Sequence, residues 1–206
     1  MNAPGQMPKV VVSLGTDHHR FNRLVDWIDQ WMEQRQTPVD CVVQHGFSRA
    51  PRYATAVERM PRHELLELYR QSEIVVVQGG PGSILDAREV GRVPIAVPRR
   101  PELDEVVDGH QIIFTDIMSK QGDAIMAEDY AGFVLKLEAA IAQPATVTTA
   151  PRVARPDIAT YKLEEAIFSG FLQSDKGRTR RRLKQLIGAK GNPLAASGGP
   201  GHGGNP

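Results

Sequence analysis

The sequence contains very little cysteine and no long apolar run, and both absences limit what the protein can be. Cys41 is the only cysteine in 206 residues, so no intrachain disulfide can form, which fits a reducing compartment. Cys41 lies beside Val42 and Val43, where burial keeps a thiol protonated, so we expect it to fill the core rather than to act as a nucleophile. No stretch approaches the roughly 18 apolar residues that span a bilayer, and the N-terminus lacks a signal-peptide pattern. We therefore expect a cytoplasmic protein.

Acidic residues are absent from the C-terminal end of the chain. All 24 of them lie in residues 1–175, whereas seven of the 25 basic residues follow. The first segment therefore carries a net charge of −6 and the tail +7, although the whole chain carries only +1. This asymmetry predicts that the tail meets an anionic partner, and the alternative is a solvated helix face.

Apolar residues recur along the chain in patterns that alternate between strand and helix. Strands are expected at residues 9–14, 39–44, 74–77, 93–97 and 124–126. Helices are expected from an N-cap at Asp17, from 61–63, over 83–91, from about 108 to 120 and over 130–141, while 49–60 should be irregular. Several strand segments are apolar throughout, as in strands that are buried on both faces of a sheet. The alternation predicts an α/β fold with a doubly wound parallel sheet.

Proline and glycine divide the chain into segments. We expect residues 1–142 to form one Rossmann-like nucleotide-binding domain, followed by a linker at 143–157 that contains three prolines. A basic helical extension should cover 158–188. The Gly/Pro/Ser-rich tail at 189–206 should be disordered, because it has too few apolar side chains to form a core.

The stretch from Glu73 to Asp86 combines a buried strand, a glycine turn and the start of a helix. Glycines let the backbone approach a ligand, and the free N–H groups at a helix start point at negative charge, so such a turn can hold a phosphate. Asp86 follows one helical turn later, where a carboxylate can accept hydrogen bonds from two ribose hydroxyls. The stretch favours a nucleotide site, but it matches neither a GxGxxG nor a Walker A motif, and many glycine turns in α/β folds bind nothing.

Three motifs, taken in order, resemble those of a known family. They are Val-Val-Ser-Leu-Gly-Thr at 11–16, Gly-Gly-Pro-Gly-Ser-Ile-Leu-Asp at 79–86 and Asp-Gly-His-Gln at 108–111. They resemble the C-terminal, donor-binding domain of family 28 glycosyltransferases, which are GT-B enzymes, over about residues 9–142. This family includes the catalytic subunit of the split dolichol-diphosphate GlcNAc transferase and bacterial exopolysaccharide relatives, and the length of the chain resembles those proteins.

The resemblance implies a site for a UDP-sugar donor that needs neither a cofactor nor a metal. By their positions in the motifs and in the loop after the second strand, the donor-binding residues would be Gly15, Thr16, Gln44, Gly80, Gly82, Ser83, Ile84, Asp86, His110 and Gln111. The chain departs from the family at two places. Asp86 stands where a longer Glu usually contacts the ribose, and Gln78 replaces a His that often precedes the glycine turn.

The resemblance also implies inverting transfer, in which a general base takes the proton of the acceptor hydroxyl. The resemblance implies that, in one-chain relatives, this base lies in the N-terminal domain. The 206 residues do not include such a domain. His18 and His19, at the mouth of the first helix, are the candidates for a catalytic base here. The alternative is that both are exposed residues at the start of that helix.

These expectations describe the donor-binding subunit of an inverting glycosyltransferase that moves a sugar from a UDP-sugar to a lipid-linked or polysaccharide acceptor. Because a GT-B site lies between two domains, we expect a membrane-anchored acceptor-binding subunit as the partner and a peripheral position at the cytoplasmic membrane face. The cluster Arg180–Arg182 would then contact anionic lipid, at about 1 kcal/mol per basic residue.

Nucleic acid is not an expected partner, because the rest of the chain is acidic and no aromatic residues interleave the basic run. Two alternatives remain open: a non-catalytic nucleotide-sugar-binding or scaffold subunit, and a self-sufficient transferase that acts as a homodimer.

Overall fold

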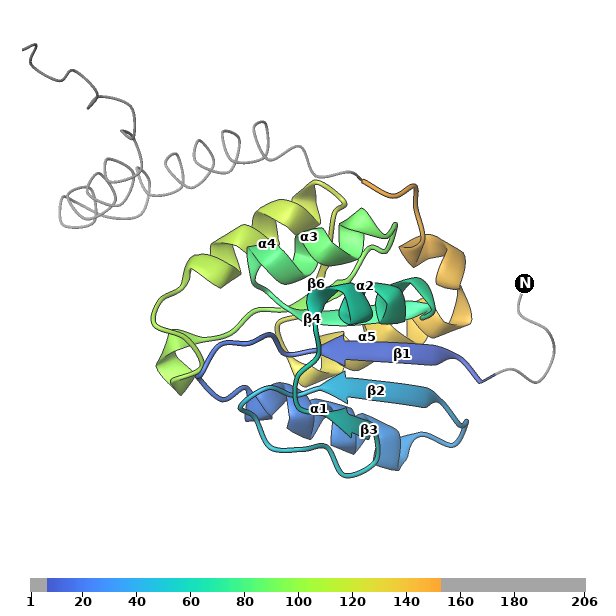
Figure 1. Ribbon diagram of the computed structural model, residues 1–206, viewed down its shortest axis with the longest axis horizontal. Helices are drawn as coiled ribbons and strands as arrows, with labels where there is room; N and C mark the ends of the chain where they lie inside the picture. The colour runs from blue at the N-terminus through green and yellow to red at the C-terminus, as the bar shows by residue number, and fades with distance from the viewer. Residues whose placement is uncertain (1–6, 153–206) are drawn as a thin grey trace, which may run out of the picture. The chain divides into compact units, whose positions relative to one another are not determined.

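The computed structural model describes residues 7–152, which form a six-stranded sheet flanked by helices (Figure 1). The strands are β1 (Lys9–Ser13), β2 (Asp40–Gln44), β3 (Thr55–Val57), β4 (Ile74–Gln78), β5 (Ile95–Val97) and β6 (Ile125–Met126). All adjacent strands pair in parallel, in the order β3-β2-β1-β4-β5-β6. This is the strand order of dinucleotide-binding Rossmann folds, so the expected fold class is confirmed. The expected helical extension at 158–188, with Arg180–Arg182, and the tail at 189–206 lie outside the described residues.

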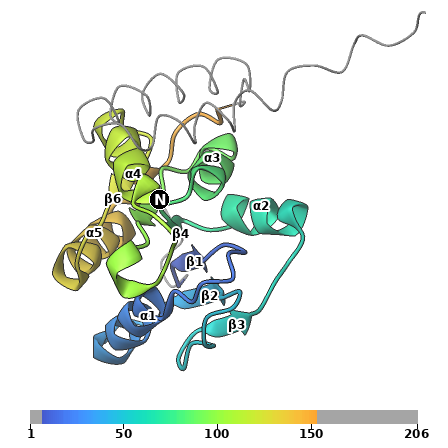
Figure 2. The ribbon, with the colours of Figure 1, turned by 90° about the vertical axis from the view of Figure 1, so that its left-hand side faces the viewer.

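Helices cover both faces of the sheet, as Figure 2 shows in a view along the strands. The helices are α1 (Asn22–Gln34), α2 (Arg62–Arg70), α3 (Pro81–Glu89), α4 (His110–Lys120) and α5 (Tyr130–Ala142), with two 3-10 turns, η1 (Pro101–Leu103) and η2 (Pro144–Val147). One face carries α1 and α5, and the other carries α2, α3 and α4. None of the described helices is long and apolar enough to cross a membrane.

The central strands β1 and β4 are apolar throughout because both of their faces are covered. Val10 pairs with Ile74 and Val12 with Val76, and all four side chains are buried. Successive side chains of a strand point to opposite faces, so alternate residues of β1 and β4 pack under α1 and α5 and the others under α2 and α3. The valine and isoleucine runs therefore specify a central position in the sheet.

The largest apolar cluster lies between the sheet and the helices α1 and α5. Its centre includes Leu24 and Ile28 of α1 together with Phe133 and Leu137 of α5, all fully buried. The ring of Trp27 lies 5.7 Å from that of Phe133, centre to centre. Each fully buried side chain of this kind contributes about 1.5–3 kcal/mol, so this layer provides much of the stability of the fold.

Two local expectations are wrong. Residues 49–60 are not wholly irregular, because β3 forms within them as an edge strand paired with β2. Asp17 is not the N-cap of α1, since Phe21 occupies that position. Contacts from distant loops explain the late start: Ser48 Oγ accepts a 2.8 Å hydrogen bond from the N–H of Phe21, and Arg99 donates a 2.7 Å bond to the carbonyl of His19.

The chain after α5 continues along the same domain. Val147, in η2, is buried, and its carbonyl accepts a 2.9 Å hydrogen bond from the N–H of Val93. The N–H of Thr149 donates a 2.9 Å bond to the carbonyl of Gly91. Residues 143–152, which fall in the expected linker, are therefore tied to the segment between α3 and β5.

Candidate functional site

The loops that follow β1, β2, β4 and β5 meet at the carboxyl edge of the sheet. The N–H of Leu14, at the end of β1, donates a 2.9 Å hydrogen bond to the carbonyl of Gln44, and the N–H of Gly79 donates a 3.1 Å bond to the carbonyl of Val97. Because the sheet is parallel throughout, all these loops leave the same edge, where ligands bind in this architecture. Most of the residues predicted from the sequence to bind a donor lie at this edge.

The glycine turn brings three elements close together and leaves one side open. A Cβ on Gly79 would lie 2.4 Å from Oγ1 of Thr115 in α4 and 2.8 Å from Cα of Pro98, so only glycine fits there. A Cβ on Gly82, in the first turn of α3, would meet no atom within 4 Å. Pro81 begins α3, and the N–H groups of its first turn have no helical partner. The turn can therefore receive an anion on its open side.

Gln78 lies under this turn and has a polar atom without a partner. Its Nε2 contacts Oγ of Ser83 at 3.1 Å, whereas its Oε1 is buried and has no hydrogen-bond partner among the described residues. A Cβ on Gly80 would lie 2.3 Å from Nε2 of Gln78, so the amide fills the space under the turn. An orphaned buried acceptor beside an open turn fits a site that a polar ligand completes.

The carboxylate of Asp86 forms an ion pair rather than standing free. Its Oδ1 accepts hydrogen bonds from Nε and Nη2 of Arg62 in α2, at 3.0 and 2.7 Å, and the same Nη2 donates to Oε2 of Glu89 at 2.6 Å. The hydrogen bonds to Asp86 and Glu89 raise the pKa of Arg62 above its ordinary value. The predicted ribose-binding residue therefore carries a partner that the sequence did not reveal.

The loop after β1 is fixed from below by Gln44. The Nε2 of Gln44 donates to the carbonyls of Gly15 and Glu58, both at 3.2 Å, and its Oε1 accepts a 2.8 Å bond from Ser13. Gly15 has φ +79°, a left-handed conformation that favours glycine. Thr16, the next residue, is exposed. The structure thus gives Gln44 a supporting position, while Thr16 faces solvent as a ligand contact would require.

Asp17 holds His19 in a defined orientation. The Oδ1 of Asp17 lies 2.6 Å from Nδ1 of His19 and accepts a 2.8 Å bond from the N–H of His19. Partial burial opposes ionisation, but these hydrogen bonds and the charge of Arg99 outweigh it and hold the pKa of Asp17 below its ordinary value. An ionised Asp17 requires the proton of a neutral His19 to sit on Nδ1, so Nε2 is the basic nitrogen. His18 is largely exposed, with its ring 4.0 Å from that of His19.

Asp17, His18 and His19 also form the one group of three within residues 7–152 that has the spacing of metal ligands. One ligand atom from each lies within 4.8 Å of the others. The Oδ1 atom of Asp17 also contacts Nδ1 of His19, so the same group of residues orients this histidine.

The N-terminus of α4 lies on the other side of the glycine turn. Thr115 of α4 donates a 3.2 Å bond to the carbonyl of Gly79, which ties the helix to the turn. At the start of α4, Nδ1 of His110 lies 2.5 Å from the carboxylate of Asp108, and Oε1 of Gln111 accepts a 3.3 Å bond from the N–H of Arg99. His110 is exposed and Gln111 is half-buried.

Arg99 is a fully buried cation behind the site. Its guanidinium donates to the carbonyls of Leu14, His19 and Glu105, at 2.9, 2.7 and 2.8 Å. It also lies 4.9 Å from the centre of the Phe21 ring. Burial lowers the pKa of Arg99, which the charges of Asp17 and Glu105 oppose. The residue joins the loops after β1 and β5, so it sets the position of the residues in front of it.

The structure brings most of the predicted site residues to the carboxyl edge of the sheet. They belong to helices, or to the loops before them, that cover opposite faces of the sheet. Gly80, Gly82, Ser83, Ile84 and Asp86 belong to the turn and α3, although Ile84 is buried in the core. His18 and His19 lie in the loop before α1, and His110 lies at the start of α4. The sequence reasoning missed Arg62 and Arg99 and gave Gln78 no role. Only Gln78 had a signal, its place directly before the turn, because the contacts of the other two come from the tertiary fold.

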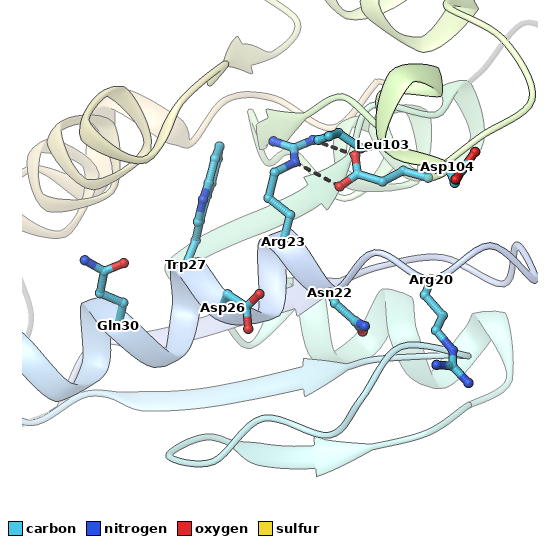
Figure 3. Close-up of a pocket in the computed structure, with 9 residues that line it drawn as sticks. Arg20, Asn22, Arg23, Asp26, Trp27, Gln30, Leu103 and Asp104 are labelled. Carbon is cyan, nitrogen blue, oxygen red and sulfur yellow. Dashed lines mark hydrogen bonds and ion pairs between the residues drawn. The ribbon is translucent and has the colours of Figure 1, made fainter.

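A separate pocket of about 660 Å³ lies on the outer side of α1 and does not include the glycine turn (Figure 3). Arg23 and Trp27 rise from α1 toward the segment that contains Leu103 and Asp104. The guanidinium of Arg23 lies 4.9 Å from the centre of the Trp27 ring and pairs with Glu105 at 2.7 Å. These contacts anchor the loop after β5 on α1.

Comparison with known proteins supports the fold and no more. No family model and no curated protein matches the chain. The solution structure of ALG13 matches with a TM-score of 0.50 and 16% identity, over 77% of this chain and 96% of that one. MurG from Acinetobacter baumannii matches with a TM-score of 0.49 and 13% identity, over 70% of this chain and 44% of that one. The glycosyltransferase SnogD from Streptomyces nogalater gives 0.47 and 15%, over 92% and 46%.

The chain spans less than half the length of the MurG and SnogD chains that it matches, and nearly the whole of ALG13. The expected resemblance is confirmed at the level of the fold alone: residues 7–152 form a Rossmann-like α/β domain, and ALG13 has a similar fold.

Proposed function

We propose that the chain is the donor-binding subunit of an inverting glycosyltransferase that uses a UDP-sugar. The observation that carries the proposal is the glycine turn at the carboxyl edge, with its open side, its helix start and Asp86 one helical turn further along α3. Phosphate oxygens are bound by N–H groups at a helix start, and a carboxylate is a natural acceptor for ribose hydroxyls. This combination fits a nucleoside diphosphate better than a free phosphate or a dinucleotide.

The diphosphate would lie over Gly80, Gly82 and Ser83, and the ribose would lie beside Asp86. Asp86 is five residues from the start of α3 at Pro81, so it lies about 7.5 Å along the helix axis. That separation matches the reach from a diphosphate to the hydroxyls of its ribose. The sugar would then lie between the starts of α1 and α4, near His19 and His110.

Transfer would occur in one displacement. The oxygen of the acceptor hydroxyl forms a bond to the anomeric carbon, the bond from that carbon to the diphosphate breaks, and UDP leaves with the electron pair. The Nε2 of His19 takes the proton of the hydroxyl, and Asp17 stabilises the imidazolium that results. The N–H groups of the turn and the start of α3 stabilise the charge that develops on the leaving diphosphate.

The acceptor needs a second binding surface. Residues 7–152 form one Rossmann-like domain, whereas a GT-B site lies between two. We propose a membrane-anchored subunit that binds a lipid-linked or polysaccharide acceptor and brings the hydroxyl to His19, at the membrane surface. A second copy of this chain is the alternative, and the measured mass of the active complex separates the two.

Calorimetric titration of the full chain with UDP, with GDP and NAD as controls, tests the donor site. We expect selective binding of UDP and, in Asp86→Ala, a loss of affinity of about tenfold or more, because the bond of a hydroxyl to a charged acceptor is removed. Equal affinity for UDP and GDP, or unchanged binding by Asp86→Ala, would reject the assignment. Binding without turnover in the reconstituted complex would favour the non-catalytic subunit instead.

A further inference from the structure

Arg62 holds one oxygen of Asp86 and leaves the other. Both of its donors, Nε and Nη2, end on Oδ1 of the carboxylate, at 3.0 and 2.7 Å. Because both bonds from the guanidinium end on Oδ1, Oδ2 is the oxygen left for a ligand. Nη2 also donates to Glu89 at 2.6 Å, which holds the guanidinium from a second side.

The pair lies beside the carboxyl edge. Arg62 is the first residue of α2, four residues after Glu58. The carbonyl of Glu58 accepts hydrogen bonds from Gln44, the last residue of β2, and from Gly46 in the loop that follows. Asp86 lies in α3, which packs beside α2, and its Oδ1 contacts Arg62 at the start of α2. The ion pair therefore bridges α2 and α3.

An ordinary role in folding does not account for this arrangement. The side chain of Arg62 is 58% exposed, and ion pairs with such exposure contribute about 0–1 kcal/mol to stability. The side chain of Asp86, in contrast, is only 20% exposed. An exposed cation that contacts a half-buried carboxylate has more effect on what the carboxylate binds than on the stability of the fold.

We propose that Arg62 is a positioning residue that orients Asp86 toward the ribose hydroxyls of the donor, so that the site distinguishes ribose from deoxyribose. This inference rests on the proposed function. Arg62 acts in two ways. It fixes the direction of Oδ2, and its charge offsets one of the two carboxylates, Asp86 and Glu89, that would otherwise repel the diphosphate.

The shorter side chain of Asp86 makes this role more important. An aspartate reaches less far than a glutamate, and one of its oxygens is already occupied, so Oδ2 has to meet the hydroxyls with little freedom to adjust. If the carboxylate is already oriented before the ligand binds, the entropic cost of binding is smaller. Removal of Arg62 should therefore weaken the recognition of the hydroxyls more than it weakens the contacts to the diphosphate.

The experiment compares UDP with 2′-deoxy-UDP on the full chain and its variants by calorimetry. We expect the wild-type protein to prefer UDP by about tenfold, because one hydrogen bond to a charged acceptor is lost with the deoxy compound. In Arg62→Ala, this preference should fall to about twofold or less, together with weaker binding of both ligands. Arg62→Lys should restore the charge, and so part of the affinity, but not the preference, because an ammonium cannot fix the carboxylate.

Arg70→Ala is the matched control, since Arg70 lies in the same helix and pairs with Glu67, away from Asp86. It should leave both the affinity and the preference unchanged. If Arg62→Ala keeps the full preference while its melting temperature is close to that of the wild type, Arg62 is only a link between helices and the inference is wrong. If the wild-type protein binds UDP without any preference over the deoxy compound, Asp86 does not read the ribose, which also rejects the inference. If the wild type does not bind UDP at all, the proposed function fails as well.

Discussion

The interior under α1 and α5 and the carboxyl edge of the sheet are built in opposite ways. Under α1 and α5, valine, leucine, isoleucine and aromatic side chains form one continuous cluster. At the edge, polar side chains hold the loops: Gln44 reaches the carbonyl of Gly15, and Arg99 reaches that of Leu14. The interior gains stability from apolar area that is removed from water. At the edge, the hydrogen bonds hold the loops in defined positions, and they leave the space in front of the loops open for a ligand.

This difference predicts which substitutions affect folding and which affect binding. The largest expected effect is that of Phe133→Ala in the interior. The side chain is fully buried and packs on Trp27, so its removal should lower the free energy of unfolding by about 3–5 kcal/mol. Urea denaturation measures the loss. Leu135→Ala is the control in the same helix, since Leu135 is 71% exposed. Apart from the difference in helix propensity, this substitution should lower the free energy of unfolding by less than about 0.5 kcal/mol.

The next largest effect is expected from Arg99→Met at the edge. The substitution leaves the carbonyls of Leu14, His19 and Glu105 without their donor, and unsatisfied buried groups cost about 1–3 kcal/mol each before the loops adjust. We expect a loss of about 3 kcal/mol in unfolding free energy and, in contrast to Phe133→Ala, a local loosening of residues 15–21 in hydrogen exchange. Uniform exchange across the domain would show that Arg99 acts as an ordinary core residue.

The strands of the interior could be predicted because burial leaves a simple pattern. The apolar runs at 9–14 and 74–77 indicate strands buried on both faces of a parallel sheet, and β1 and β4 do lie in its middle. The edge strand β3 could not be found in this way. Thr55 and Ala56 are exposed, and the strand exists because its backbone pairs with β2, which no local pattern of side chains records.

The carboxyl edge could be predicted in outline but not in its contacts. The glycine turn and the motifs located the candidate site, since glycines and helix starts have local signatures. The pairing of Arg62 with Asp86 depends on α2 lying beside α3, and the late start of α1 depends on Ser48 and Arg99. These contacts join residues that are distant in sequence, so only the folded chain shows them.

The Asp17–His19 pair should affect turnover without affecting the interior. In Asp17→Asn, the amide can donate to Nδ1 and thereby place the proton of His19 on Nε2, which then cannot act as a base. We expect turnover of the reconstituted transferase to fall about hundredfold. The affinity for UDP and the melting temperature should change little. If the affinity for UDP fell as much as the turnover, Asp17 would hold the loop in place rather than set the tautomer of His19.

Gly82→Ala should separate folding from binding at the turn itself. A Cβ at this position meets no atom within 4 Å, and alanine is the better helix former, so the free energy of unfolding should stay the same or rise slightly. If the diphosphate lies on the open side, the methyl group displaces it, and affinity for UDP should fall about tenfold, as expected for one lost charged hydrogen bond. Unchanged affinity would place the diphosphate elsewhere along the edge.

The smallest expected effect concerns the rim of the interior, where Glu138 of α5 accepts hydrogen bonds from Trp31 and Arg35 of α1. Partial burial opposes ionisation of Glu138, but the hydrogen bonds from Arg35 and Trp31 outweigh it and hold its pKa below the ordinary value. A lowered pKa stabilises the fold above the ordinary pKa of a glutamate, and the contribution disappears as the pH falls through the lowered value.

The free energy of unfolding of Glu138→Gln, compared with that of the wild-type protein between pH 6 and pH 3 by urea denaturation, measures this contribution. Because the carboxylate is 44% exposed, the difference should be under about 1 kcal/mol at pH 6 and should vanish in acid. A larger difference would mean that charge, and not only apolar area, holds α1 against α5. The interior would then resemble the carboxyl edge more closely than its buried side chains indicate.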